Sequence, residues 1–553
     1  MLAKTDLLRF LKSQNFLAAA TYLVIATVLA GAGLTAHVFW ADEAMTALIA
    51  RNIVTLGQLT GWDGTNVYAY HGGLDLDESL RQFVGPFLQF YVTAASFWLF
   101  GESTIAGRLP FLVMGLASLV VMHCWVARQF NKPIAEPVDR DFPAWLPSLL
   151  LALNVSFLLF SRQCRYYSLV FLFFPALFWA FAALRDSRRP WLTIVLGVLA
   201  AIALYAAHYM AGVGAVAIMA ILLLRPRYRT RMHFIFVAAT GAVVGTWAVY
   251  TLATGDPTQL AGPPRGGIPV WQNAPTLMWW QLRALGSFEF LPLLVMPILA
   301  LPFFLARLKK QRAVAEQGAW AFAGAMLFLL ITAVASPQPT QGPQTDGIPI
   351  MRYVLPVLML GSVATACAIV IVWRWLGRGA AAALAALVVL TNVTYLGATS
   401  IRSTLWELVY EQTHWQPSGS DAMATYAQAL PADTQIKVEP HWMTAPVQFY
   451  APHLRFVGVL NAFKKIEPGV RAQLPEYVFL GRTLPQIVMI GFDATRLSNT
   501  VLIQGRNYAL KTVIKTYWID LTRPELVSHE FRRDPANDQR HVIAVFELAA
   551  GPQ

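Results

Sequence analysis

The sequence predicts a polytopic α-helical membrane protein with a small α/β domain at its C-terminal end. Of its 553 residues, 56% are hydrophobic and only 13% are charged, whereas charged residues make up about a quarter of an average soluble domain. Apolar runs of about 18 or more residues recur along the chain, and a run of that length crosses a bilayer as a helix. From about residue 400 the apolar runs become short and rich in β-branched and aromatic residues, which is typical of strands.

The first apolar run, residues 16–39, predicts a retained membrane span. It follows the basic segment "MLAKTDLLRFLKSQNF" and is too long for the apolar part of a signal peptide. Later basic clusters should face the cytoplasm: "RDSRRP" (185–190), "RPRYRTR" (225–231), "ARLKKQR" (306–312) and "WRWLGRG" (373–379). The loops around His208, at 254–288 and at 336–350, and the chain after residue 400, are then outside.

Hydropathy predicts about twelve spans, at residues 16–39, 83–100, 107–126, 144–160, 168–184, 191–208, 209–224, 232–253, 289–306, 319–335, 351–373 and 379–398. An inside N-terminus and an outside C-terminus require an odd number of crossings. We therefore expect a short, re-entrant or split helix within residues 83–184.

Residues 401–553 are expected to form the extracytoplasmic α/β domain, because roughly 150 residues suit a single domain. Strands are expected in the runs "TQIKVEP", "RFVGVL", "PQIVMIG", "YALKTVIKTYWI" and "HVIAVFEL". Residues 420–430 predict a helix with Ser420 as a candidate N-cap.

The charge and the cysteines exclude other classes of protein. The formal net charge is +12, but the basic residues gather at the ends of apolar segments. That pattern indicates membrane topology and contact with anionic lipids rather than nucleic acid binding. Cys124, Cys164 and Cys367 lie in or beside apolar segments, with neither a disulfide pattern nor metal-ligand spacing.

Two adjacent carboxylates, Asp42 and Glu43, follow the first expected span. They are either solvated residues that end the helix or groups held at the depth of the lipid headgroups. The following "MTALIARNIVTLG" predicts an amphipathic helix along the membrane surface, with Met45, Leu48, Ile49 and Ile53 on its apolar side. Such a helix would place a candidate general base at the membrane edge, where a lipid-linked substrate reacts.

The segment "FSRQCRYYSL", residues 160–169, is the second candidate site. Arg162 and Arg165 are i,i+3 neighbours if the segment is helical, so they would share one face. Tyr166 and Tyr167 follow directly. The group is either an ordinary interfacial belt of Arg and Tyr or a phosphate clamp with aromatic walls, because guanidinium groups donate bidentately to phosphate.

Further cations and aromatic residues are expected on the outer face. His208 lies at a turn between two expected spans, and Arg352 and Tyr353 open another span from outside. Arg265 and Arg283 belong to the long outer loop. Each alone is typical of a membrane interface, but together they supply the donors that an anionic lipid headgroup requires.

An acidic loop offers the one candidate metal site. Asp75 and Asp77 in "GLDLDESLRQF" have the DxD spacing of metal-dependent nucleotide-sugar transferases. Those enzymes use cytoplasmic donors, whereas this loop should be outside. The two acids either bind a divalent cation, line the acceptor entrance or are solvated. The sequence contains no P-loop, HExxH motif or CxxC motif.

Five segments occur in an order that resembles a known family: "WADEA", "FGESTIAGRLP" (100–110), "SRQCRYYSL", "HYM" and "MRYVLP". Across roughly residues 15–400 the chain resembles the GT-C glycosyltransferases of the protein-mannosyltransferase type, which include the bacterial lipid A aminoarabinose transferases. It departs from the aminoarabinose branch before the second span, where "RQFVGPF" replaces a "KPP"-like stretch. Residues 401–553 resemble the soluble domain of the bacterial members more weakly.

The resemblance implies a GT-C fold with about 12–13 transmembrane helices in residues 1–400, and a first periplasmic loop at 40–82. It implies a polyprenyl-phosphate sugar donor, such as an undecaprenyl-phosphate sugar, presented at the outer leaflet. Asp42 matches the family's presumed base or acceptor-orienting acid, and Glu43 matches its neighbour. Arg108 matches an Arg of the "RLP" stretch without an assigned role. We expect the donor phosphate to be bound by Arg162, Arg165, Tyr166, Tyr167, His208, Arg265, Arg352 and Tyr353.

The expected function is inverting glycosyl transfer on the outer face of a bacterial inner membrane. The acceptor is a hydroxyl or phosphate of a glycolipid such as lipid A or lipopolysaccharide, a polysaccharide or a protein. No cofactor is expected with certainty, and a divalent cation stays open. The alternative is a lipid-linked glycan flippase or another polytopic transporter. Transporters more often have inverted repeats and charges near the membrane midplane, and neither is visible here.

Overall fold

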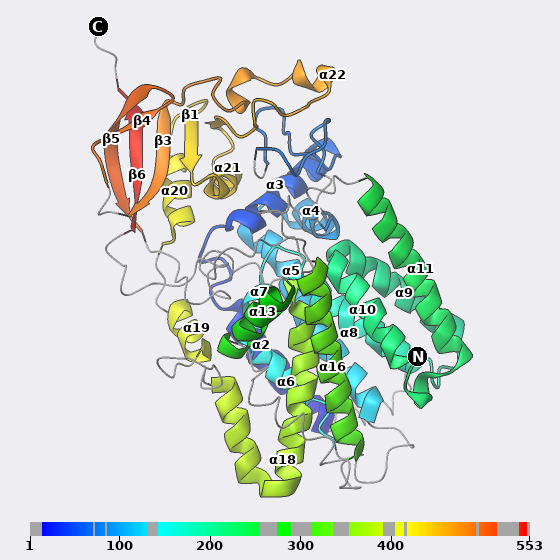
Figure 1. Cartoon of the computed structure of the whole chain (residues 1–553). Helices are drawn as coiled ribbons and strands as arrows, with labels where there is room; N and C mark the ends of the chain where they lie inside the picture. Colours follow the sequence, from blue (N-terminus) through cyan, green and yellow to red (C-terminus); the bar gives the residue numbers. More distant parts are fainter. Residues whose placement is uncertain are drawn as a thin grey trace. The chain divides into compact units, whose positions relative to one another are not determined.

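The computed structural model describes residues 14–69, 72–82, 86–130, 142–254, 274–288, 312–335, 353–390, 404–413, 417–493, 497–516 and 541–549 (Figure 1). The chain forms two compact units. Residues 1–32, 111–162 and 166–410 make up the first, which we call the helical unit. Residues 33–110, 163–165 and 411–553 make up the second, which we call the α/β unit.

The helical unit contains α2 (Gln14–Gly31), most of α5 (Thr104–Phe130), α6 (Leu146–Ala152), α7 (Val155–Ser161), α8 (Tyr167–Ala183), α9 (Pro190–Ala207), α10 (Tyr209–Leu222), η2 (Pro226–Tyr228), α11 (Arg231–Thr254), α13 (Ala274–Phe288), α16 (Arg312–Ala335), α18 (Leu355–Leu390) and most of α19 (Thr404–Thr413). Apolar side chains on the outside of this unit suit contact with lipid rather than water. On α9, for example, Val195, Leu196 and Leu199 are 52–55% exposed.

Five helices of the described part are long and apolar enough to cross a membrane: Thr104–Phe130, Pro190–Ala207, Arg231–Tyr250, Ala313–Val334 and Leu355–Val389. Shorter apolar helices accompany them at Phe16–Gly31, Leu88–Phe100, Tyr167–Ala183 and Tyr209–Leu222. The predicted class, a polytopic helical membrane protein, is therefore confirmed. The count of 12–13 spans stays a prediction, because the expected span at 289–306 lies outside the described residues.

The expected span at 144–160 is a split helix. α6 ends at Ala152 and α7 begins at Val155, and the extended backbone of Asn154 separates them. The Asn154 side chain accepts the Phe157 N–H at 2.8 Å and so caps the new helix. Each piece has seven residues, too few to cross a bilayer. This is the kind of irregularity that the parity of the spans predicts for residues 83–184.

α18 joins two of the expected spans through a sharp interruption at Gly377. The φ and ψ angles of this residue are 86° and 178°, a conformation that is essentially restricted to glycine. Figure 1 shows the two arms of α18 joined at an angle at one end of the helical unit. The basic segment 373–379 therefore separates two helices, as the sequence predicts.

The α/β unit is built on a six-stranded mixed sheet in the order β2-β1-β3-β6-β5-β4. The strands are β1 (Gln435–Glu439), β2 (Arg455–Phe456), β3 (Ile487–Asp493), β4 (Thr500–Ile503), β5 (Arg506–Lys515) and β6 (His541–Leu548). β1 pairs in parallel with β2 and β3, and the remaining pairs are antiparallel. All five predicted strand regions contain a strand; β4 is the one that the sequence prediction lacks.

One face of this sheet is covered by α20 (Gly419–Gln428) and α21 (Thr444–Tyr450). Ile436 and Val438 alternate along β1 and pack there with Met423 and Val447. Shorter elements of the unit are η5 (His441–Met443), α22 (Pro468–Arg471) and η6 (Glu476–Val478). The predicted helix at 420–430 is confirmed, but its N-cap is Ser418 and not Ser420. The Ser418 side chain accepts the Asp421 N–H at 3.2 Å, so the helix begins at Gly419.

The first loop belongs to the same unit as the C-terminal strands. Asn66 is buried and joins the two: its Nδ2 donates to Leu454 O at 2.8 Å, and its Oδ1 accepts the Phe456 N–H at 2.9 Å. Gln448 likewise donates to Val67 O at 3.0 Å. Residues 411–553 thus share a compact unit with residues 33–110 and 163–165, whereas residues 401–410 belong to the helical unit. The domain predicted at 401–553 stays a prediction.

The helix after the Asp–Glu pair is confirmed as α3 (Ala41–Leu56), but it is not a surface helix. Residues 41–50 are all buried, on every side of the helix. α4 (Leu88–Phe100) and α21 both pack against α3, so the helix lies inside the α/β unit. The preceding helix α2 already ends at Gly31, and an irregular segment, residues 32–40, connects it to α3.

Candidate active site

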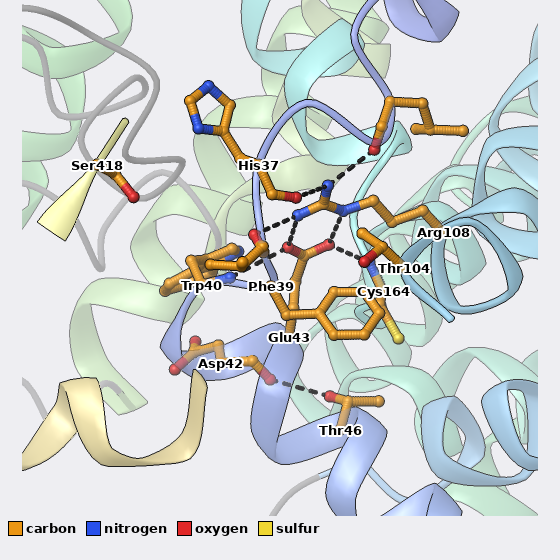
Figure 2. Close-up of polar contacts among 12 residues, drawn as sticks. His37, Phe39, Trp40, Asp42, Glu43, Thr46, Thr104, Arg108, Cys164 and Ser418 are labelled. Atoms are coloured by element: carbon orange, nitrogen blue, oxygen red, sulfur yellow. Dashed lines mark hydrogen bonds and ion pairs between the residues drawn. The ribbon is translucent and has the colours of Figure 1, made fainter. Parts of the chain in front are cut away.

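Arg108 of α5 holds the start of α3 in place through every N–H of its guanidinium group (Figure 2). Nε and Nη2 donate to the two carboxylate oxygens of Glu43 at 2.9 and 2.6 Å. Nη1 donates to Leu34 O at 2.8 Å and to His37 O at 3.0 Å, and Nη2 also donates to Val38 O at 3.0 Å. Five N–H groups therefore bind the segment before α3 and its first turn.

Both oxygens of the Glu43 carboxylate accept hydrogen bonds from other residues of the α/β unit. Besides Arg108, it accepts the Cys164 N–H at 2.8 Å and the Trp40 N–H at 3.4 Å. Glu43 is 0% exposed and Arg108 is 2% exposed. The ion pair therefore connects α3, α5 and the loop that carries Cys164.

Close packing supports the same arrangement. Phe39 is fully buried, and its ring lies against Gly107 of α5. A Cβ atom at Gly107 would lie 2.5 Å from Cζ of Phe39, so the helix can approach the ring only because residue 107 is glycine. The guanidinium of Arg108 lies 5.3 Å from the Phe39 ring centroid, within the range of a cation–π contact.

Asp42 forms a separate ion pair with Arg165. Nη2 of Arg165 lies 3.1 Å from Oδ2 of Asp42, and Nη1 donates to the Thr46 hydroxyl at 3.3 Å. The Asp42 and Arg165 side chains are 11% and 13% exposed, whereas the Glu43 side chain is 1% exposed. The two adjacent acids therefore differ in exposure. Glu43 is enclosed by protein, whereas the side chains of Asp42 and Arg165 are partly accessible to solvent.

The predicted shared helical face of Arg162 and Arg165 is wrong. α7 ends at Ser161 and α8 begins at Tyr167, so residues 162–166 form an irregular turn. Arg165 N–H donates to Gln163 O at 2.7 Å within this turn. The two arginines belong to different compact units, Arg162 to the helical unit and Arg165 to the α/β unit.

The indole of Trp40 adds a donor beside the first turn of α3. Its Nε1–H is buried and has no hydrogen-bond partner among the residues that the structure describes. A buried donor without a partner costs about 1–3 kcal/mol, and a ligand that accepted a hydrogen bond from this N–H would remove that cost.

The segment before α3 is also anchored to the C-terminal part of the unit. Oδ2 of Asp421 lies 2.7 Å from Nδ1 of His37, and Oδ1 accepts the Val38 N–H at 2.8 Å. Burial opposes the ionisation of Asp421. The hydrogen bonds from His37, Val38 and Ser418 outweigh this effect and lower the pKa of the carboxyl below its ordinary value of 3.8.

Tyr450 of α21 makes a second anchor. Its hydroxyl accepts the Phe39 N–H at 3.0 Å and lies 2.7 Å from the Thr104 hydroxyl at the start of α5. Burial raises the pKa of Tyr450 to about 12, so the hydroxyl stays protonated at neutral pH. Asp421 and Tyr450 thus hold residues 37–39, which lead directly into Asp42.

In the helical unit, four of the predicted donor-site residues gather in one aromatic group. The ring centroids of Tyr166 and His208 are 5.2 Å apart, and those of His208 and Tyr353 are 5.8 Å apart. Tyr167 packs edge-to-face on Tyr166 at 4.6 Å. His208 also caps α10, because its Nδ1 accepts the Ala211 N–H at 3.1 Å. Residues from three distant parts of the sequence therefore meet here.

Other predicted residues are placed only in part. Arg162 is buried in the helical unit. Arg265 and Arg352 lie outside the described residues, and for Arg283 the structure describes the backbone of α13 alone.

The acidic loop has a local structural role at Asp77. Its Oδ1 accepts hydrogen bonds from Ser79 N, Ser79 Oγ and Arg81 N at 2.8–2.9 Å, which fixes a turn. Asp75 is buried. No three His, Cys, Asp or Glu side chains gather as a metal site within the described ranges, so a divalent cation stays a prediction.

Sequence reasoning gave no role to Arg108 and did not single out Trp40, Tyr450 or Asp421. Arg108 and Trp40 both lie in the quoted segments "FGESTIAGRLP" and "WADEA". A basic residue inside an apolar span was the available signal for Arg108, because a charge there needs a partner. Tyr450 and Asp421 lie more than 340 residues from their partners Thr104 and His37, and nothing local marks them.

Comparisons with known proteins agree with this architecture. No family model and no curated protein matches the sequence. The fold is similar to that of ArnT from Cupriavidus metallidurans in a crystal structure bound to undecaprenyl phosphate. The TM-score is 0.51 at 16% identity, over 97% of this chain and 99% of that chain. The same protein in its apo state gives a TM-score of 0.46 at 16% identity, with the same coverage of both chains.

A third similarity is to the oligosaccharyltransferase AglB from Archaeoglobus fulgidus, at a TM-score of 0.46 and 10% identity, over 88% of this chain and 70% of that chain. The fold assignment rests on the bound form of ArnT, since the other two scores are below 0.5. The predicted ArnT-like GT-C fold is confirmed.

Proposed function

We propose that this chain, which has the ArnT-like GT-C fold, is an inverting glycosyltransferase that uses a polyprenyl-phosphate sugar donor. The Asp42–Arg165 pair at the start of α3 carries the proposal. It combines a partly accessible carboxylate with a phosphate-binding side chain. The similarity to a protein described with bound undecaprenyl phosphate supports this class of donor.

In the proposed reaction, Asp42 takes the proton of an acceptor hydroxyl while the oxygen attacks C1 of the sugar. The bond between C1 and the phosphate oxygen breaks, and polyprenyl phosphate leaves with the electron pair. One displacement through an oxocarbenium-like transition state inverts the anomer. General base catalysis contributes roughly 10²–10⁴-fold to such a step.

A phosphate leaving group needs stabilisation of its developing charge more than it needs a proton. Arg165 is proposed to stabilise this charge, because its guanidinium lies beside Asp42 and can donate hydrogen bonds to a phosphate oxygen. The unpaired indole N–H of Trp40 is proposed as a second hydrogen-bond donor to the leaving phosphate. Glu43 is proposed as a positioning residue rather than a base, because Arg108, Trp40 and Cys164 occupy its carboxylate.

The other residues that the sequence predicts for the donor site remain proposed contacts. Within the helical unit they include the aromatic group of Tyr166, Tyr167, His208 and Tyr353. Such an aromatic group suits the sugar or the first isoprene units. Arg162, Arg265 and Arg352 remain proposed phosphate ligands. The proposed acceptor is a glycolipid, a polysaccharide or a protein at the outer face of a bacterial inner membrane.

The test is an assay of purified full-length protein with synthetic undecaprenyl-phosphate sugars, in which release of undecaprenyl phosphate is measured with crude envelope extract as the acceptor source. Asp42→Asn should lower the rate about 10²–10⁴-fold and leave donor binding largely intact. Arg165→Ala should weaken donor binding as well. The matched control is Asp433→Asn, which removes an exposed carboxylate of the same unit and should keep the wild-type rate.

Two results would contradict the proposal. Near wild-type turnover by Asp42→Asn would show that Asp42 is not the base. Absence of release by the wild type with any donor would favour the transporter alternative instead.

A further inference from the structure

A pocket of about 310 Å³ lies at the carboxyl ends of β1 and β2 in the α/β unit. Its walls include Val438 and Glu439 at the end of β1, and Val457 and Gly458 directly after β2. We call it the strand-end pocket. The two strands are parallel neighbours, and the carboxyl ends of parallel strands are a common place for ligands in α/β proteins.

The segment that connects β1 to β2 closes one side of the pocket. Trp442 of η5 and Gln448 of α21 line it. Trp442 is partly buried against the core on α20 and α21 and is therefore held in a fixed position. Asn461, which follows the β2 segment, also lines the pocket, and its backbone N–H donates to Gly72 O at 3.0 Å.

Two charged side chains that line the pocket, Lys437 and Glu439, form an ion pair. Nζ of Lys437 lies 3.0 Å from Oε1 of Glu439. The two residues are separated by one position on β1, so they share a face of the strand. The pair presents N–H donors and carboxylate acceptors side by side without net charge. This favours a ligand whose neighbouring groups both donate and accept, such as adjacent sugar hydroxyls, over a phosphate. The aromatic ring of Trp442 also lines the pocket, and such a ring suits the apolar face of a sugar.

The pocket also reaches the helix of the proposed base. Met45 of α3 lines it and lies three residues after Asp42. Residues three apart on a helix are neighbours on its surface, so one wall of the pocket and the Asp42 carboxylate share a turn of α3.

We propose that the strand-end pocket binds a neutral sugar ring of the acceptor and that the acceptor is therefore a glycan. The inference rests on the glycosyl transfer proposed above. Sugar binding in the pocket orients a neighbouring hydroxyl toward Asp42.

The test uses full-length Asp42→Asn protein, so that binding is measured without turnover. The ligands are a panel of fluorescein-labelled neutral di- to tetrasaccharides, and the readout is fluorescence polarisation. At least one saccharide should bind. Trp442→Ala and the more conservative Glu439→Gln should each weaken its binding roughly ten-fold or more, as loss of a central contact does. Thermal unfolding of each variant reports whether it has folded.

The matched control is Lys511→Met. Lys511 pairs with Glu547 at 3.1 Å on the same sheet, but it does not line the pocket. This variant should bind the saccharide as Asp42→Asn alone does. A saccharide that binds should also accept the sugar when it is offered to wild-type protein with donor.

Several results would overturn the inference: no binding of any saccharide, binding that survives both Trp442→Ala and Glu439→Gln, or bound saccharides that never accept a sugar. Binding of a labelled Ser/Thr-rich peptide that Trp442→Ala abolishes would also overturn it, in favour of a protein acceptor. Release of undecaprenyl phosphate with envelope extract tests the enzyme class separately, so failure of the pocket is distinguishable from failure of the proposed function.

Discussion

At the scale of residues, the start of α3 is held in place by the hydrogen bonds of one arginine, Arg108. Its planar guanidinium donates in fixed directions, and at Arg108 two of these directions meet the Glu43 carboxylate while three meet backbone carbonyls. A lysine has three donors on one nitrogen and could not satisfy the same five acceptors. The position of Asp42 follows, because it lies in the turn that this network fixes.

The first prediction concerns this buried pair. Glu43→Gln should lower the free energy of unfolding by about 3–5 kcal/mol, because it leaves the Arg108 charge buried without a counter-charge. The measurement is thermal or denaturant unfolding of the purified protein. Glu476→Gln, which removes an exposed partner of Arg471, is the control and should cost less than about 1 kcal/mol.

A double variant separates charge from packing. Glu43→Met with Arg108→Met should recover part of the stability that Glu43→Gln loses, since no unpaired charge remains. Equal losses in Glu43→Gln and Glu476→Gln would contradict a buried, uncompensated charge as the cause.

Single residues were predictable where their chemistry was visible in the sequence. The adjacent acids Asp42 and Glu43 stood out at the end of an apolar run, but their different burial did not, because it comes from Arg108, which is 65 positions from Glu43. The shared face of Arg162 and Arg165 failed for a local reason. The helical period assumes an unbroken helix, and α7 stops one residue before Arg162.

At the scale of elements, the N-terminus of α20 is the point where this helix is attached to the segment before α3. Asp421 closes the cap of its own helix through Ser418 and also binds His37 and Val38 of the segment before α3. A carboxylate near a helix N-terminus is additionally favoured by the helix dipole. One ionised side chain therefore stabilises α20 and its attachment to the segment that leads to Asp42.

The second prediction is a pH dependence. Because the folded state lowers the pKa of Asp421 below 3.8, its contribution to stability is fully present above that value. It is lost as the pH falls through the folded pKa. Wild-type unfolding temperatures should therefore fall more steeply below about pH 4 than those of Asp421→Asn, which should be less stable at pH 7. Parallel curves for the two proteins would contradict this role.

Elements were predictable where their apolar pattern is regular. Among the described residues, the long apolar helices and the strands of the five predicted runs are where the sequence places them. β4 has only four residues, all at least partly exposed, and its pairing with β5 rather than its composition makes it a strand. The amphipathic pattern of α3 predicted a helix correctly but its environment wrongly, because α4 and α21 pack against the helix and residues 41–50 are all buried.

At the scale of the whole molecule, the compact units do not follow the order of the sequence. The segment that carries Asp42 belongs with the last strands of the chain and not with the apolar helices that separate them in sequence. Hydropathy and strand patterns are read along the chain, so they predict the boundary at 400 and cannot detect pairings such as Asn66 with Phe456, 390 positions apart.

The third prediction concerns topology. Alkaline phosphatase fused after Gln553 should be active, because the C-terminal end is expected outside the cytoplasm. Green fluorescent protein fused after Arg189 should fluoresce, because the basic cluster at 185–190 should be inside. The reverse pattern would place the Asp42 segment on the cytoplasmic side and remove the polyprenyl-phosphate donor from consideration.

The anchoring of Asn66 has a consequence for biosynthesis. Its buried side chain acquires its partners, Leu454 O and Phe456 N, only when residues almost 390 positions later have left the ribosome. At roughly 5–20 residues per second, that interval is about 20–80 s. The strand β6, which lies between β3 and β5, arrives later still. During synthesis the nascent chain therefore carries the Asp42 segment with its contacts to Arg108 and Arg165 but without those to Asp421 and Tyr450. A ribosome that stops before residue 421 leaves a chain in which these two anchors of the segment are missing.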